Sequence, residues 1–240
     1  MITINSGATT IFKNNLVSIG NIYKVITDGL VLYLDAGIAA SYPGSGTIWT
    51  DLSGNENSGS FVNDPTYDSA NGGSIVFDGI NDYINCGNKT SLQISVGTIS
   101  SWVKLSSIIS GYRGILVKQL DWGLFAKDGI FITYDWTASL DRSTGINIAD
   151  GNWKNVSMTF TETIGSPSNN AIVYLNGIAV LTTTVQKPPA NTVALTIGSG
   201  SPSVSQIFNG NIANSIVYNR VLSPQEILQN YNAQKTKFGQ

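Results

Sequence analysis

Polar and apolar positions alternate over short stretches of this chain, and turn-forming residues separate the stretches. Apolar runs of five to eight residues recur between clusters of Gly, Asn, Asp and Pro. The pattern is typical of an antiparallel sandwich or barrel, because half-buried strands alternate in polarity and tight turns join them. The clearest expected strands are 30–35, 74–78, 98–105, 114–118, 153–161, 194–197 and 210–218.

Two hairpins can be located by their turns. Asn176-Gly177 interrupts the apolar stretch 171–181, and Asp128-Gly129 interrupts the stretch 122–134. Asn-Gly and Asp-Gly accept the two positive φ angles that a type I′ turn requires. We therefore expect each stretch to fold as two strands joined by a two-residue turn.

A single helix is predicted, near the C-terminus. The segment Ser223-Pro-Gln-Glu226 combines a capping box with proline at the first helical position. Leu222 and Ile227 are spaced to form the hydrophobic contact that fixes the entry of such a helix. We expect the helix to lie on the sandwich and to close one end of it.

Residues 1–27 differ from the rest of the chain, because they are polar and precede the first clear strand. We predict that they form an N-terminal arm or adapter outside a domain of residues 28–240; one extra edge strand is the alternative. They contain neither an early basic cluster nor a long apolar core, so they do not read as a secretory signal. Either a signal has been removed or the protein reaches its destination without one.

The composition excludes several classes of partner. Only 12% of the 240 residues are charged, with a net charge of −2 and no basic patch, so nucleic-acid binding is not expected. No apolar run reaches the roughly 18–20 residues of a membrane span. The chain is long enough to bury a large core without disulfides, and its one cysteine, Cys86, forms no intrachain bridge.

Catalytic groups are scarce. The chain has no histidine, which excludes His-based triads and most zinc sites. Glycoside hydrolysis needs two carboxylates flanking the scissile bond. The glutamates lie in a turn, at a strand end and in a helix cap, not as a pair on one strand face: Glu56, Glu162 and Glu226. Asp121, Asp128 and Asp135 recur, but Asp128 belongs to a hairpin turn. We expect a protein that is not an enzyme.

Six short segments appear in a familiar order. They are Asp28–Gly37, Trp49–Asn55, Gly73–Tyr83, Asp150–Val156, Val173–Gly177 with Ile197-Gly198, and Phe208–Ile227. In this order they resemble the laminin-G-like branch of the concanavalin A-like lectin/glucanase superfamily, over roughly residues 28–238. The resemblance implies an all-β fold, in which two antiparallel sheets form a jelly-roll sandwich with the first and last strands side by side.

The opening Asp28–Gly37, followed by Tyr42–Trp49, looks like the form found in bacteriophage structural proteins. This narrower likeness implies a virion component, such as a capsid decoration, head-fibre or tail-associated module, that displays a lectin-like domain for adhesion to host-surface glycans. Residues 1–27 and the sheet edges would then contact other virion proteins, in a homo-oligomer. The alternative is a secreted or cell-surface bacterial carbohydrate-binding module.

Carbohydrate binding needs an exposed aromatic platform with polar groups nearby. The best cluster in the sequence combines Tyr134 and Trp136 with Trp122, Tyr112 and Arg113. Alternation places Tyr134 and Trp136 on one face of a strand. On an outer face they would stack against sugars, and facing the other sheet they would be core residues, which is the interpretation we favour. Tyr42 and Trp49 form the second candidate platform.

No cofactor is required by these motifs, although a calcium ion is possible. The resemblance implies a calcium site at a loop rim, and calcium prefers carboxylate and amide oxygens. The candidate ligands are Asp51, Asn55 and Asp82. However, Asn214 stands near where relatives often place an acidic residue, and ordinary turn-forming hydrogen bonds are the alternative role for these side chains.

Overall fold

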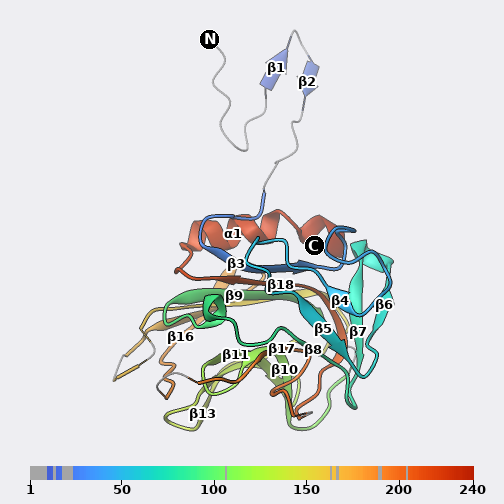
Figure 1. The fold of residues 1–240 in the computed structure, drawn as a ribbon. Helices are drawn as coiled ribbons and strands as arrows, with labels where there is room; N and C mark the ends of the chain where they lie inside the picture. Colours follow the sequence, from blue (N-terminus) through green and yellow to red (C-terminus); the bar gives the residue numbers. More distant parts are fainter. Residues whose placement is uncertain are drawn as a thin grey trace.

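The chain folds into two antiparallel sheets packed face to face, with a helix on the outside of one of them (Figure 1). The computed structural model describes residues 24–105, 107–162, 164–165, 168–188, 191–203 and 205–240, and the strand backbone at 10–12 and 15–17. The predicted jelly-roll sandwich is confirmed. None of the described helices is long and apolar enough to cross a membrane.

The first sheet contains both the first and the last strand of the sandwich in sequence order. Its order is β16 (Ile178–Thr183), β15 (Ala171–Leu175), β14 (Lys154–Phe160), β9 (Gly97–Lys104), β18 (Asn209–Tyr218), β7 (Ser74–Asp78) and β6 (Thr66–Asp68). The last strand, β18, also pairs with the first strand of the sandwich, β3 (Leu30–Asp35). The expected adjacency of first and last strands is therefore confirmed.

The second sheet has eight strands. Its order is β13 (Leu140–Asn147), β12 (Ile130–Asp135), β11 (Trp122–Lys127), β10 (Tyr112–Lys118), β17 (Leu195–Ile197), β8 (Tyr83–Asn85), β5 (Gly59–Val62) and β4 (Ile48–Trp49). Three consecutive strands, β10 to β12, form an antiparallel meander at one side of this sheet.

Both predicted hairpin turns are present. Asp128 and Gly129 have φ angles of 52° and 81°, and Asn176 and Gly177 have φ angles of 52° and 77°. These are the positive angles of a type I′ turn, which matches the twist of the flanking strands. The strands that no sequence pattern predicted are short, as β4 and β8 are, or polar and at an edge, as β13 is.

The core between the sheets is aromatic and aliphatic. Trp122 is 1% exposed and stacks on Phe160 with ring centroids 6.4 Å apart. Trp49 and Tyr42 are buried in the same core. The structure thus contradicts Trp122 as a ligand contact and Tyr42 with Trp49 as a second platform, because all three side chains are buried in this core.

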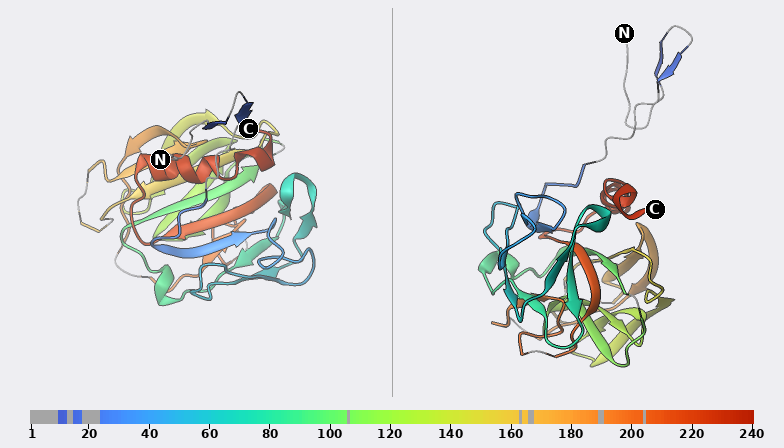
Figure 2. Two further views of the ribbon diagram at one scale, coloured as in Figure 1. Left: turned by 90° about the horizontal axis from the view of Figure 1, so that it is seen from above. Right: turned by 90° about the vertical axis from the view of Figure 1, so that its right-hand side faces the viewer.

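The helix α1 (Pro224–Asn232) begins as the sequence indicates. The Ser223 hydroxyl accepts from the Glu226 amide, and the Glu226 carboxylate accepts from the Ser223 amide. The helix covers the outer face of the first sheet, not an end of the sandwich (Figure 2). Below it, Trp102 stacks on Phe238 with ring centroids 4.2 Å apart, so Trp102 is buried under the helix and outside the inter-sheet core.

The N-terminal segment is described in two parts. β1 (Thr10–Phe12) and β2 (Asn15–Val17) pair as an antiparallel hairpin, and residues 1–9, 13–14 and 18–23 of the predicted arm lie outside the described residues. Residues 24–27 contact α1: the Ile26 amide donates to Asn230 Oδ1 at 2.8 Å. The boundary at residue 28 stays a prediction.

Candidate ligand-binding site

Four aromatic rings gather on the outer face of the second sheet, on the side away from α1. They belong to Tyr112 on β10, Phe125 on β11, Tyr134 on β12 and Trp136 directly after β12. Each ring contacts two others, with centroids 6.2 Å apart for Tyr112–Phe125, Tyr112–Tyr134 and Phe125–Trp136, and 5.4 Å for Tyr134–Trp136. The rings therefore form a closed cycle over three adjacent strands.

The strand register explains this gathering. Phe125 pairs with Ile132 across the hairpin, so alternation places Phe125 and Tyr134 on the same outer face. The backbone amide of Trp136 donates to the Gln186 carbonyl at 3.0 Å, which fixes the strand end that carries the indole. Val117 and Ile132 complete the apolar floor.

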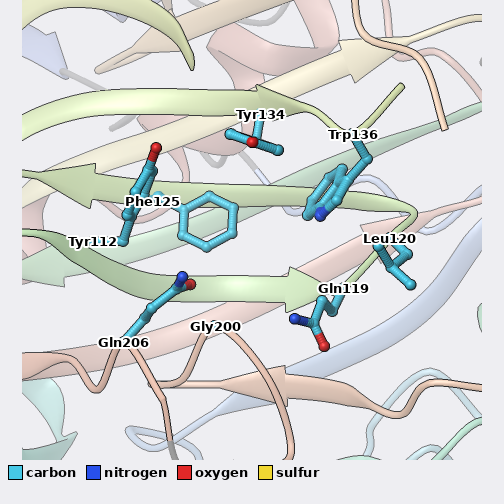
Figure 3. Close-up of a pocket in the computed structure, with 8 residues that line it drawn as sticks. All are labelled: Tyr112, Gln119, Leu120, Phe125, Tyr134, Trp136, Gly200 and Gln206. Atoms are coloured by element: carbon cyan, nitrogen blue, oxygen red, sulfur yellow. The ribbon is translucent and has the colours of Figure 1, made fainter. Parts of the chain in front are cut away.

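The rings line an open pocket with a volume of about 240 Å³. Phe125 is buried, whereas Tyr112, Tyr134 and Trp136 are partly exposed. Figure 3 shows the rings on one side and the side-chain amides of Gln119 and Gln206 on the other. The remaining lining comes from Leu120 and Gly200. The pocket thus joins stacking surfaces with groups that donate and accept hydrogen bonds.

The Tyr112 ring is fixed by an ionic contact at the strand edge. Its hydroxyl donates to Asp141 Oδ1 at 2.7 Å and accepts from Lys127 Nζ at 3.1 Å. The ammonium of Lys127 also lies 4.5 Å from the Tyr112 ring centroid. Burial and the hydrogen bond to Asp141 raise the pKa of Tyr112, and the Asp141 carboxylate raises the pKa of Lys127. The phenol is therefore neutral and held in place.

The structure brings together three of the five residues proposed as ligand contacts: Tyr112, Tyr134 and Trp136. The core placement that we favoured for Tyr134 and Trp136 is wrong, since β12 turns these side chains away from the other sheet. Arg113 is not among the lining residues; its guanidinium donates to the carbonyls of Tyr112 and Ser110. Alternation along β10 places the Arg113 side chain on the other face of the sheet from Tyr112.

Sequence reasoning missed Phe125, Gln119 and Gln206. Phe125 had a signal, because a two-residue turn at 128–129 already places residues 125 and 132 opposite each other. Gln206 had none: it reaches the pocket from the loop between β17 and β18, where its carbonyl accepts from the Gly114 amide at 2.7 Å. No local pattern predicts that contact.

The first candidate calcium ligand, Asp51, is occupied by protein donors. Its Oδ1 accepts from the amides of Tyr33 and Ser53, both at 2.9 Å, and its Oδ2 accepts from the Asn57 amide at 2.9 Å and the Ser53 hydroxyl at 2.7 Å. A carboxylate that already accepts four hydrogen bonds organises its loop and does not favour a metal ion. The Asn55 Nδ2 group donates to the Leu30 carbonyl and to the Ser53 hydroxyl, both at 3.1 Å, so this side chain is held within the same loop.

Asp82 does not join Asp51 in one site. Asp51 contacts Ser58, just before β5 begins, whereas Asp82 precedes Tyr83, which pairs with Val62 at the far end of β5. A strand rises about 3.3 Å per residue, so the two carboxylates lie roughly 10 Å or more apart. Among the residues that the structure describes, no three His, Cys, Asp or Glu side chains cluster as metal ligands.

The glutamates do not meet at the pocket either. Glu226 pairs with Arg220 at the helix cap, and Glu56 pairs with Lys89 on an exposed loop. The pocket lining contains no carboxylate. Within the described residues, the paired carboxylates that glycoside hydrolysis requires are therefore not found at this site.

The fold and the sequence together define the class of protein. Residues 78–228 match the family model described as the concanavalin A-like lectin/glucanases superfamily. The match covers more than half of the chain, and the chain belongs to this superfamily. It is a lectin-like jelly-roll domain. No curated protein sequence matches it.

Several solved structures share the fold. The binding domain of Paraclostridial Mosquitocidal Protein 1 aligns over 86% of this chain and 52% of its own, with 17% identity and a TM-score of 0.65. Trypanosoma rangeli sialidase in complex with sialic acid aligns over 98% and 37%, with 17% identity and a TM-score of 0.66. The chain spans less than two thirds of either protein.

A third structure is similar over nearly its whole length. Domain 4 of AbnA, a GH43 extracellular arabinanase from Geobacillus stearothermophilus, solved in complex with arabinotriose, aligns over 84% of this chain and 98% of its own. The identity is 16% and the TM-score is 0.64. At these identities, the three likenesses show the fold.

Proposed function

We propose that this chain is a non-catalytic carbohydrate-binding module and that the four-ring pocket is its binding site. The observation that carries the proposal is the closed cycle of Tyr112, Phe125, Tyr134 and Trp136 facing two glutamine amides. The C–H faces of a sugar ring stack on aromatic rings, and the sugar hydroxyls pair with amides. Ligand sites in general combine such apolar walls with a few placed polar groups.

Two further points support the proposal. Domain 4 of AbnA, which shares the fold over nearly its whole length, was solved in complex with arabinotriose. Arabinotriose is therefore a reasonable first probe for this chain. The pocket lining also lacks carboxylates, so it is suited to holding a glycan and not to hydrolysing one.

Replacing Trp136 tests the site. On an oligosaccharide array that includes arabinotriose, we expect Trp136→Ala to lower affinity for bound glycans at least tenfold, since an aromatic side chain that a ligand covers commonly contributes more than about 1.4 kcal/mol. The melting temperature should fall by only a few degrees, because the indole is partly exposed. Tyr67→Ala is the matched control, an aromatic truncation on β6 of the other sheet. Unchanged binding by Trp136→Ala with a large loss of melting temperature refutes the site.

We further propose that the module is displayed on a bacteriophage particle. The support is the resemblance of the segments Asp28–Gly37 and Tyr42–Trp49 to bacteriophage structural proteins. The alternative is a secreted or cell-surface bacterial module. Electron microscopy of the source material tests the two: density for this chain in a symmetric shell or fibre supports the virion, and its presence in a cell-envelope or secreted fraction alone contradicts it.

A further inference from the structure

A second hollow, of about 170 Å³, opens beside the turn between β10 and β11. At its base, Lys187 Nζ and Asp121 Oδ1 are 2.5 Å apart, and their side chains are 6% and 3% exposed. The rest of the lining comes from Gln93, Ser95, Ile164 and Asn191. A buried ion pair thus lies at the base of a hollow that opens to solvent.

The hydrogen bonding of this pair is incomplete. Among the described residues, the Asp121 carboxylate accepts only through Oδ1, from Lys187. The side-chain nitrogen of Asn191 is fully buried and has no partner among those residues, although Asn191 Oδ1 accepts from the Val193 amide at 2.9 Å. Buried polar groups are nearly always paired, so the unpartnered donor of Asn191 indicates a missing partner, and Asp121 Oδ2 is a second available group in the same hollow.

The unpaired groups match the chemistry of sugar hydroxyls. A hydroxyl both donates and accepts, so one hydroxyl can donate to Asp121 Oδ2 while its neighbour accepts from Asn191 Nδ2. Burial raises the pKa of Asp121, while the hydrogen bond from Lys187 and the ammonium charges of Lys187 and Lys118 limit the rise. Lys187 donates to the Ile94 carbonyl besides Asp121, and one of its three hydrogens remains for a ligand.

The hollow adjoins the four-ring pocket. Gln119 and Leu120 line the pocket, and Asp121, the next residue of the same turn, lines the hollow. On the other side, the Trp136 amide is bonded to the carbonyl of Gln186, which precedes Lys187. The half-exposed side chain of Leu120 therefore stands between two recesses at the same end of the meander.

From this arrangement we infer that the hollow is a second sugar subsite, and that the ligand is an oligosaccharide long enough to extend from the four-ring pocket around Leu120 to Asp121 and Asn191. This inference rests on the proposed function and adds a ligand class to it: extended chains with adjacent free hydroxyls, in preference to single sugars or disaccharides. A purely structural role for the ion pair, tying the 186–188 segment to the turn, predicts no such length preference.

The decisive variant is Asn191→Asp. It keeps the size of the side chain and the oxygen that accepts from Val193, and it replaces the buried donor with a carboxylate oxygen, which also adds a negative charge to the hollow. Asn147→Asp is the matched control, because Asn147 Oδ1 makes the same bond to the Ala149 amide on an exposed edge away from both recesses. The probes are arabino-, xylo-, malto- and cello-oligosaccharides from two to six units, titrated by calorimetry.

We expect the wild type and Asn147→Asp to bind the longer members of the preferred series more tightly than the disaccharide. Asn191→Asp should lose about three- to tenfold affinity for the longer members and bind the disaccharide as before, in line with one lost hydrogen bond. In ¹⁵N-labelled protein, the side-chain amide signal of Asn191 should shift with the longer probes only.

Three results overturn the inference. If affinity does not rise with length, or if Asn191→Asp affects short and long probes equally, the hollow is no subsite, while binding lost in Trp136→Ala still supports the four-ring pocket. If no member of any series binds the wild type, the proposed function and this inference both fail.

Discussion

At the scale of single residues, the four-ring pocket depends on a glycine. Gly123 points to the outer face, where an added Cβ would lie 2.9 Å from Phe125 and 3.3 Å from both Trp136 and Val117. The absent side chain leaves the space in which the indole of Trp136 rests against Phe125. The size of this one residue therefore sets the depth of the pocket floor.

Gly123→Val tests this dependence. The valine methyl groups should displace the Trp136 ring outward, so we expect at least a tenfold loss of glycan affinity and about 1–3 kcal/mol of destabilisation from overpacking. Binding is checked by titration with the oligosaccharide that the array identifies, and stability by urea unfolding. Gly145→Ala has open space around the new Cβ but a φ of 70°, so it should lose stability through backbone strain and keep wild-type affinity, which separates destabilisation from loss of the pocket. Wild-type affinity in Gly123→Val contradicts the assignment of the floor.

The same scale shows what the sequence could predict of the site. Alternation correctly placed Tyr134 and Trp136 on one face of a strand, because side chains repeat every two residues. Which face points to solvent depends on the sheet that packs behind it, and no local pattern contains that information. Trp122 has the same residue type as Trp136 and lies in the same meander, yet opposite parity in the pleat makes it core.

At the scale of elements, the helix was predictable because its cap is local chemistry. Ser223, Pro224 and Glu226 act on neighbours within one turn, and the capping box forms as expected. The face on which α1 packs was not predictable, since it depends on Trp102 and Ala213 from distant strands and on Phe238, which follows the helix. Strand pairs with two-residue turns were also predictable, because the turn residues lie next to the strands that they join. Short strands such as β4 were not predictable, because two residues are too few to show an alternating pattern.

The cap predicts a pH dependence. The Arg220 guanidinium and the Ser223 amide lower the pKa of Glu226 from 4.5 to about 2. Because the pKa is lower in the folded state, the stabilisation is fully present above about pH 4.5 and is lost as the pH falls towards about 2. Glu226→Gln should cost about 1 kcal/mol at pH 7 and roughly a quarter of that at pH 2.5, where part of the Glu226 population is still ionised in the folded state.

Urea unfolding of the wild type and of Glu226→Gln at the two pH values measures this difference. Glu56→Gln is the control, since the Glu56 side chain is 86% exposed and should behave as the wild type at both. An equal deficit of Glu226→Gln at pH 7 and pH 2.5 would show that the loss comes from packing and not from the charge.

At the scale of the whole molecule, the resemblance supplied the topology. The pairing of β3 with β18 joins positions nearly 200 residues apart in the chain, and alternation alone gives no such register. The ordered motifs provided it, because they place the chain in a superfamily whose first and last strands are adjacent. Composition limited the classes of function. The few charges argue against nucleic-acid binding, the absence of histidine excludes His-based catalytic triads, and the single cysteine excludes an intrachain disulfide.

The arm hypothesis also belongs to this scale. Lys24 and Ile26 bond to Gln229 and Asn230 of α1, so a deletion through residue 27 would disturb the helix. Deleting residues 1–23 is the cleaner change. We expect the truncated chain to keep the wild-type melting temperature and glycan binding, and to fail to incorporate into particles in a virion assembly assay. Normal incorporation of the truncated chain contradicts the role of the arm.

The contact between residues 24–27 and α1 has a directional consequence. Residue 24 lies on the helix-covered side of the domain, while β10 to β12, whose outer face carries the four-ring pocket, lie on the opposite side of the sandwich (Figure 1). A domain anchored through its leading segment would therefore present its recesses outward, at the full thickness of two sheets from the anchor. Copies grouped around a common support would keep their pockets unobstructed, and each could engage a separate branch of one glycan surface.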